Sequence, residues 1–326
     1  MKLIVMVAAA FVTMLSVHPA QAQAPFPSRT ITLLNPNAPG GTGDIIGHGM
    51  TEPLRAALKQ PVILINRVGA GGAVGGAYVA QAPADGYTVL LNTVTHVLIP
   101  ITDNVLGRSS GYTVEDFQLL ARITADPLLL IVHPSIPAKT VKEFVALAKA
   151  KPDELIYSST GVYGSGHIAM IMLARAADVN LVHSPFNGGG PAMTAVLGNH
   201  ANAFFAPAGV ANPHMQAGRV RALAQSGAKR APLFPDLPTV KEAGYDADLT
   251  LWAGYFAPVK TPPAVVKVWQ SALRESAQDA KFRDAMAKLN VTIDYLDGDA
   301  LKGWYDDELK RLDREIRAIG KIESRT

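Results

Sequence analysis

Short apolar segments alternate with helical patterns along this chain, and that alternation constrains the fold more than any other feature. Residues 31–34 and 61–65 are β-branched and Leu-rich runs, and helical patterns follow them at residues 44–58 and 71–81. Residues 87–91 give the next strand. Buried strands that are joined by helical crossovers form a parallel sheet covered on both faces. The first part of the chain is therefore predicted to be α/β.

A second series of the same kind follows, and its expected strands and helices alternate at residues 155–158, 165–177, 181–184, 191–197, 203–206 and 220–224. Between the two series, residues 117–132 are expected as two longer strands and residues 140–149 as a helix. The last part of the chain predicts a strand at 249–258 and helices at 263–277, 281–289 and 299–319. At about 150 residues per domain, 326 residues allow about two domains, so the two series predict two doubly wound lobes.

Composition excludes several classes of chemistry. Hydrophobic residues make up 48% of the chain and charged residues 17%, against an average of about 25% charged, which is typical of packed cores and not of disorder. The absence of cysteine excludes disulfides, thiol nucleophiles, iron–sulfur clusters and cysteine-based zinc sites. A net charge of +3 is too balanced to predict a nucleic-acid partner.

The N-terminal residues have the pattern of an export signal. Lys2 precedes an apolar run at residues 3–17, and Ala20 and Ala22 form a small-x-small cleavage site. The run is shorter than the about 20 residues that a membrane span needs. We therefore expect a signal peptide at residues 1–22, cleaved after Ala22, and an exported mature protein. The alternative is an uncleaved N-terminal anchor, which the cleavage site disfavours.

Four polar loops stand at the carboxyl ends of predicted strands, where open α/β sheets bind ligands. The loops cover residues 37–44, 92–96, 158–167 and 184–191. None contains Lys or Arg, and three of them lead into predicted helices, whose first amide groups and positive dipole ends would face a ligand. Thr42, Thr160 and Ser165 add neutral hydroxyl donors. The loops predict a small anion held by dipoles; the alternative is that Gly, Ser and Thr only form turns and helix caps.

Other functions of these loops fail on spacing. Residues 69–74 approach the dinucleotide motif G-x-G-x-x-G but end in Val74, and no P-loop motif is present. Ser165 lacks the flanking glycines of G-x-S-x-G, and no acidic residue of its loop could orient His167. The eight histidines lack the spacing of a metal site. We expect no catalysis, no metal and no cofactor; Asp44 is expected to cap a helix, and the histidines expected to be hydrogen-bonded structural groups near a cleft are His96, His167 and His183.

Seven motifs give the chain a family resemblance, and they are residues 26–29 (FPSR), 38–44 (APGGTGD), 66–72 (NRVGAGG), 84–88 (ADGYT), 158–161 (SSTG), 188–192 (GGGPA) and 234–240 (FPDLPTV). In order and spacing they resemble the solute-binding receptors of the tripartite tricarboxylate transporters, also called Bug receptors, over nearly the whole mature chain. The resemblance implies a type II periplasmic binding protein fold, with two lobes around a ligand cleft. It also implies a periplasmic receptor, expected as a monomer, that delivers a carboxylate to membrane permease subunits.

The resemblance further implies interleaved lobes and a set of ligand loops. One lobe is expected from residues 23–115 plus about 225–260, and the other from residues 116–224 plus about 261–326, with the final helix packing across. The loops implied to grip the carboxylate lie within residues 39–44 and within residues 159–167 and 186–190. The candidate ligand-binding residues are Pro39, Gly40, Gly41, Thr42, Gly43, Asp44, Thr95, His96, Ser159, Thr160, Gly161, Tyr163, Ser165, His167, Phe186, Asn187, Gly188, Ala206 and Pro207.

Three departures from the family pattern bear on the ligand. Tyr163 stands at a loop tip where many relatives have small residues, Phe186–Asn187 replaces a Tyr-Lys pair, and Ala206–Pro207 follows a strand after which an acidic or amide residue is common. All three remove polarity, and buried polar ligand groups need partners. The favoured hypothesis is an aromatic mono- or dicarboxylate, terephthalate-like, that packs near Tyr163, Phe186 and Trp252. The alternatives are an aliphatic di- or tricarboxylate receptor, a ligand-sensing partner of a histidine kinase and, least favoured, an exported serine hydrolase.

Overall fold

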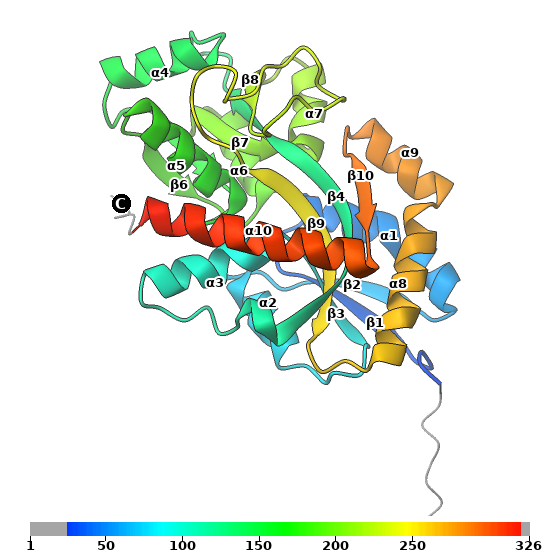
Figure 1. The fold of residues 1–326 in the computed structure, drawn as a ribbon. Helices are drawn as coiled ribbons and strands as arrows, with labels where there is room; N and C mark the ends of the chain where they lie inside the picture. The colour runs from blue at the N-terminus through cyan, green and yellow to red at the C-terminus, as the bar shows by residue number, and fades with distance from the viewer. Residues whose placement is uncertain (1–24, 321–326) are drawn as a thin grey trace, which may run out of the picture.

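Ten strands form one sheet in the computed structural model, which describes residues 25–320 (Figure 1). The strands are β1 (Ile31–Asn35), β2 (Val62–Asn66), β3 (Thr88–Thr93), β4 (Phe117–Val132), β5 (Ile156–Ser159), β6 (Val182–Pro185), β7 (Ala203–Pro207), β8 (Arg221–Gln225), β9 (Thr250–Pro258) and β10 (Ile293–Leu296). The α-helices are α1 (Thr42–Leu58), α2 (Ala73–Ala80), α3 (Thr95–Val105), α4 (Val141–Ala150), α5 (Ser165–Ala177), α6 (Gly189–Leu197), α7 (Ala208–Gln216), α8 (Pro263–Ala277), α9 (Ala280–Lys288) and α10 (Gly298–Ile319). The expected signal peptide, residues 1–22, lies outside the described residues.

The sheet consists of two parallel halves joined by two long antiparallel strands. In the first half β1 pairs in parallel with β2 and β3, and in the second half β5 pairs in parallel with β6 and β7. β4 and β9 are antiparallel to each other and run between the halves (Figure 1). β4 also pairs with β10 in the first half and with β7 and β8 in the second. The predicted α/β architecture with two wound lobes is confirmed.

β4 is a single strand of 16 residues, so the expectation of two strands over residues 117–132 is wrong. Proline lacks an amide donor and typically ends or interrupts a strand. Pro127 instead lies opposite Thr250, where β4 leaves β9 and continues to its partners in the second half. The register shifts beside Leu119 and Arg122 are irregularities of the kind that bend a strand without ending it. The bent strand thereby connects the two lobes.

Helices α8 and α9 pack on the first half of the sheet. Phe282 of α9 and Trp269 of α8 are buried in one core with Met50 of α1 and Tyr255 of β9, and Figure 1 shows α8 and α9 beside α1. The resemblance implies a second lobe that includes residues from about 261 onward. Because this core is shared with α1, we propose that the lobe boundary lies later, near the start of α10.

α10 lies across both halves of the molecule, as Figure 1 shows. It packs against α3, and Arg317 donates from Nη2 to Asn104 Oδ1 at 3.4 Å. From the second lobe, Arg175 of α5 donates from Nη1 to the Ala318 and Ile319 carbonyl oxygens at 2.9 and 2.6 Å. These bonds satisfy carbonyl groups that the C-terminal turn of a helix leaves unpaired. α10 thus bridges the two lobes on the face of the sheet that it covers.

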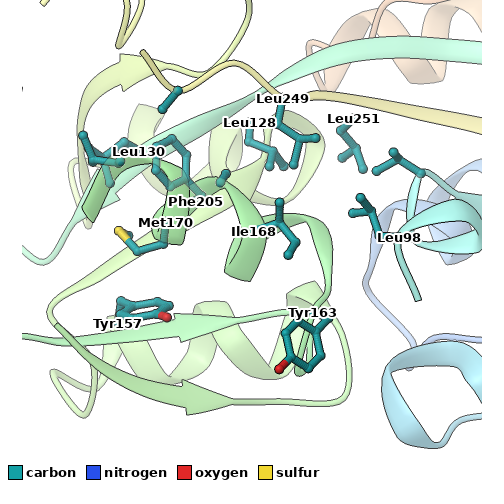
Figure 2. Packing of buried hydrophobic residues seen from close by; sticks show 14 of the residues in the cluster. Leu98, Leu128, Leu130, Tyr157, Tyr163, Ile168, Met170, Phe205, Leu249 and Leu251 are labelled. Carbon is teal, nitrogen blue, oxygen red and sulfur yellow. The ribbon is translucent and has the colours of Figure 1, made fainter. Parts of the chain in front are cut away.

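The largest buried cluster is continuous between the halves. Figure 2 shows Leu98 and Leu251 of the first half in the same cluster as Ile168 and Phe205 of the second. Burial at about 25 cal/mol per Å² of apolar surface makes such a core the main stabilising contribution in a chain without disulfides. Among residues 25–320, no helix is both long and apolar enough to cross a membrane.

Candidate functional site

Five helices begin at one small cavity between the lobes. The cavity has a volume of about 20 Å³, and its lining consists of Asn37, Gly41, Thr42, Gly43, Thr93, Thr95, Thr160, Ser165, Gly188, Gly189, Pro207 and Leu251. These residues include the first turns or N-caps of α1, α3, α5, α6 and α7. The volume is about that of one water molecule, so the lobes are closed around it. We call this space the central cavity.

The five helices that begin at the central cavity have no side-chain caps. Their N-cap residues are Gly41, Val94, Gly164, Gly188 and Pro207. None of these side chains has an oxygen that could accept from the first amides. Elsewhere, Thr140 caps α4 and Asp279 caps α9 through their side-chain oxygens, whereas α2, α8 and α10 also have no side-chain cap. The amides and positive dipole ends at the central cavity therefore favour an anionic guest.

The central cavity also contains a buried hydroxyl without a protein partner. Thr160 Oγ1 is fully covered and has no hydrogen bond within residues 25–320. On the first-lobe side of the cavity, by contrast, the Thr95 hydroxyl has partners: Oγ1 donates to Asn92 Oδ1 at 3.0 Å and lies 3.0 Å from Thr93 Oγ1. A buried hydroxyl costs free energy unless it is paired. The Thr160 hydroxyl is thus free to pair with a group that enters this cavity.

A larger cavity of about 710 Å³ lies on the other side of the loop at residues 158–167. We call it the outer cavity, and its lining consists of Ala70, Gly71, Ile99, Asp103, Arg108, Gly161, Val162, Tyr163, Pro185, Phe186, Asn187 and Pro191. Tyr163 and Phe186 line it, as the aromatic-ligand hypothesis requires. Sequence reasoning missed its first-lobe side, which includes Gly71, Ile99 and Arg108. Gly71 belongs to the glycine-rich segment whose dinucleotide motif is incomplete. A contact with the facing lobe accounts for the glycine at this residue.

Backbone contacts join the lobes between the two cavities. Ala38 N donates to Asn187 O at 3.2 Å, across the cleft. A Cβ placed on Gly161 would lie 3.1 Å from Gly71 Cα, which is tighter than most real contacts. Gly161 also has φ +139°, a backbone conformation that residues with a side chain rarely adopt. This close approach between loops requires glycine at residue 161.

Asp44 shapes the first loop instead of lining either cavity. α1 begins at Thr42, so Asp44 is the third helical residue and not the N-cap that the sequence predicts. Its Oδ2 accepts from Gly40 N at 2.9 Å, and its Oδ1 accepts from Asn66 Nδ2 at 2.8 Å. Pro39 and Gly40, also predicted for the site, line a separate outer groove with α6 and α7. The parts of this loop that line the central cavity are Asn37 and residues 41–43.

The second-lobe loop is held in shape by two histidines. Tyr163, at φ +59°, donates from its amide to His167 Nδ1 at 2.7 Å. The His167 ring stacks on His183 with 3.7 Å between centroids, and His183 Nε2 lies 2.7 Å from Ser159 Oγ. Burial lowers the pKa of His183 to about 4, and burial, then the neighbouring His183, lowers the pKa of His167 well below its usual value. Both rings are therefore neutral near pH 7.

Three predicted contacts lie away from the two cavities. His96 is fully buried and packs against Tyr112, Phe117 and Phe256, none of which lines a cleft cavity. Ala206 is buried inside β7, although the next residue, Pro207, does line the central cavity. Trp252 is also buried, and its Nε1 donates to Glu308 Oε1 at 3.2 Å. Successive strand residues face opposite ways, so Leu251 faces the central cavity and Trp252 faces α10.

The described residues carry no arrangement that favours catalysis by Ser165. His167 Nδ1 accepts a hydrogen bond from the Tyr163 amide, and the His167 ring stacks on His183, so His167 is a structural group of the loop. Ser159 likewise uses its hydroxyl to donate to Gly161 O at 2.9 Å. Among residues 25–320, no group of three or more His, Asp or Glu side chains is placed to hold a metal ion.

Comparisons with known proteins agree with this geometry. Residues 46–321 match the family model described as tripartite tricarboxylate transporter family receptor. The chain is 30% identical over 307 residues to a Cupriavidus necator protein named UPF0065 protein in gbd 5'region, covering 94% of this chain and 92% of that protein. The solved structure of the periplasmic binding protein BugD is similar with a TM-score of 0.83 and 28% identity, covering 90% of this chain and 98% of BugD.

A second solved structure is that of Rpa4515 from R. palustris with adipate. Its TM-score is 0.84 at 25% identity, and the match covers 90% of this chain and 98% of that protein. The periplasmic binding protein fold expected from the sequence is thus confirmed by similar structures along nearly the whole described chain. By the family model and by the relative at 30% identity, the chain belongs to the receptor family of the tripartite tricarboxylate transporters.

Proposed function

We propose that this protein is a periplasmic receptor that captures a small carboxylate by lobe closure and delivers it to the permease subunits of a tripartite transporter. The observation that carries the proposal is the meeting of five uncapped helix N-termini at the central cavity, with the unpaired Thr160 hydroxyl among them. Amide donors and helix dipoles suit a carboxylate group, and no cation is needed. Export through a signal peptide cleaved after Ala22, and action as a monomer, belong to the same proposal.

The body of the ligand is proposed to be aromatic. Tyr163 and Phe186 line the outer cavity together with Ile99, Pro185 and Pro191. The part of the ligand that extends from the carboxylate group into this cavity would therefore contact mostly apolar and aromatic side chains. Aromatic rings gain from edge-to-face or offset contacts beyond the burial of their area. Trp252 takes no part in this proposal, because it is buried against α10.

An aliphatic dicarboxylate is the second candidate, because the similar R. palustris protein was solved with adipate. The same closure would also serve a receptor that signals ligand occupancy to a histidine kinase. The aromatic-carboxylate receptor, the aliphatic-dicarboxylate receptor and the sensing partner would all bind their ligand without turnover. Closure is driven only by the extra contacts that the ligand makes in the closed form, and both lobes supply such contacts here.

Calorimetric titration of the mature protein with terephthalate, benzoate, adipate and citrate tests the proposal. We expect saturable binding of terephthalate, and thermal stabilisation worth about 2.7 kcal/mol at a hundredfold excess over the dissociation constant. Binding of adipate alone would replace the aromatic ligand by the aliphatic one. If none of the four acids binds, the proposed carboxylate receptor is wrong.

A further inference from the structure

Arg108 is the single cation that lines either cleft cavity in the described part of the chain. It follows α3 in the first lobe, and its guanidinium carbon lies 5.8 Å from the centre of the Tyr163 ring in the second lobe. Arg108 therefore faces the same outer cavity as the two aromatic side chains that the proposed ligand would contact. This cation lies outside every loop that the sequence identifies as a ligand loop.

The guanidinium is held at one edge and open at another. Nε and Nη2 of Arg108 donate to Asp103 Oδ1 at 3.1 and 2.8 Å. Nη1 takes no part in this pairing with Asp103. The Arg108 side chain is 56% exposed, whereas that of Asp103 is 16% exposed. Asp103 thus fixes the direction of the fork, while the remaining donors stay available to a guest in the outer cavity.

We propose that Arg108 binds a second carboxylate, so that the ligand is a dicarboxylate whose two acid groups are separated by an apolar body. The inference rests on the proposed function, in which the first carboxylate occupies the central cavity. Arginine binds carboxylates through paired, charge-assisted hydrogen bonds. A dicarboxylate that reaches from the helix N-termini to Arg108 would contact both lobes, and a monocarboxylate of the same body would lack the second attachment.

A ligand cation paired with Asp103 is the competing arrangement, and the geometry disfavours it. The Asp103 carboxylate is mostly covered, and Arg108 already occupies its Oδ1. An approaching ammonium group would meet the exposed Arg108 guanidinium first and be repelled. Asp103 is therefore a positioning residue for Arg108.

Two matched ligand pairs test the inference by calorimetry: terephthalate against benzoate, and adipate against hexanoate. We expect the dicarboxylate of at least one pair to bind more tightly than its monocarboxylate. Arg108→Gln should weaken binding of that dicarboxylate about tenfold and change the monocarboxylate little, because one charge-assisted contact is lost. Asp103→Asn should keep part of the preference for the dicarboxylate.

The chain offers a closely matched control in Arg29. Arg29 pairs with Asp85 at 2.9 Å and lies 3.8 Å from the centre of the Tyr87 ring, so it has the same acid and aromatic neighbours, but it lines neither cleft cavity. Arg29→Gln should leave all four affinities unchanged.

Equal binding within both pairs, or an equal loss of both members in Arg108→Gln, would overturn the role of Arg108 and leave the carboxylate receptor standing. A loss of dicarboxylate affinity confined to Asp103→Asn, with Arg108→Gln binding like the wild type, would also overturn the role of Arg108. If none of these four acids binds, this inference falls, and the proposed function falls with it if citrate does not bind either.

Discussion

Thr160 and Thr102 are two of the described residues that have a buried hydroxyl without a partner among residues 25–320. Of these two threonines, only Thr160 lines the central cavity. Thr160→Val replaces the hydroxyl by a methyl group of similar size, so we expect carboxylate affinity to fall about tenfold while the free energy of unfolding stays within about 1 kcal/mol. Thr102→Val is the control and should leave affinity unchanged. Equal affinities for both variants would remove Thr160 from the site.

His96 makes a pH-dependent contribution to stability. Burial lowers its pKa from 6.5 to about 3, and its ring nitrogens have no partner among the described residues. A pKa lowered by folding means that the contribution is complete above pH 6.5 and is lost as the pH falls through 6.5 toward 3. Acidification from pH 7 to pH 5 should thus remove about 2 kcal/mol of stability through His96.

His96→Phe tests this contribution, since an apolar ring would keep the packing against Phe117 and Phe256. Denaturant unfolding at pH 7 and pH 5 should show a smaller loss of stability in the variant than in the wild type. Parallel losses in both proteins would show that His96 does not titrate in this way.

Side chains were partly predictable from the sequence. Thr42, Thr160 and Ser165 follow strand ends, and the structure places all three at the central cavity. The same reasoning failed for His96. It assumes that residues after a strand face the cleft, whereas α3 directs the His96 ring toward a buried aromatic cluster. Arg108 gave no signal, since it lies 15 residues beyond β3 and reaches the cavity only through the fold.

At the scale of elements, the helix N-termini form the candidate site, and Gly41 permits one of them to approach the other lobe. Gly41 has an ordinary φ of −89°, and a Cβ there would lie 3.6 Å from Gly189 N, the first residue of α6. Gly41→Ala should therefore fold normally but cover an amide that the ligand needs. We expect at least an about tenfold loss of carboxylate affinity, measured by calorimetry.

Gly303→Ala in α10 is the matched control for Gly41→Ala, because no atom lies within 4 Å of its Cβ position. It should bind like the wild type and be slightly more stable, since alanine favours a helix. Wild-type affinity in Gly41→Ala would contradict the use of the α6 amide.

The sequence predicted most elements that have uninterrupted patterns. Residues 165–177 and 263–277 were expected as helices and are α5 and α8. α3 and α7 were missed; each contains an internal proline, Pro100 and Pro213, although α1 was predicted despite its own Pro53. β10 was missed since four partly buried residues show no clear alternation, and its pairing with β4 is a tertiary contact.

For the whole molecule, closure brings two glycine-rich loops together. A Cβ on Gly190 of α6 would lie 3.0 Å from Pro39 O in the other lobe. Gly190→Ala should therefore oppose closure while leaving each lobe intact, because alanine is favoured within a helix. In X-ray scattering with saturating terephthalate, we expect the variant to keep a larger radius of gyration than the wild type. Equal radii and equal affinities would show that these loops do not limit closure.

The overall architecture was predictable because two βαβ series specify the two parallel halves of the sheet. The packing of α8 and α9 on α1, on which the proposed lobe boundary rests, was not predictable, since it depends on contacts such as Phe282 against Gly49. These contacts join residues more than 200 positions apart, and no local pattern encodes them.

The crystal structure of the mature protein with terephthalate tests the central claim most directly. We predict one carboxylate within hydrogen-bonding distance of the first amides of α1 and α6 and of Thr160 Oγ1, with the ring beside Tyr163 and Phe186. A ligand bound outside the cleft, or a carboxylate held by side-chain cations in place of these amides, would contradict the account.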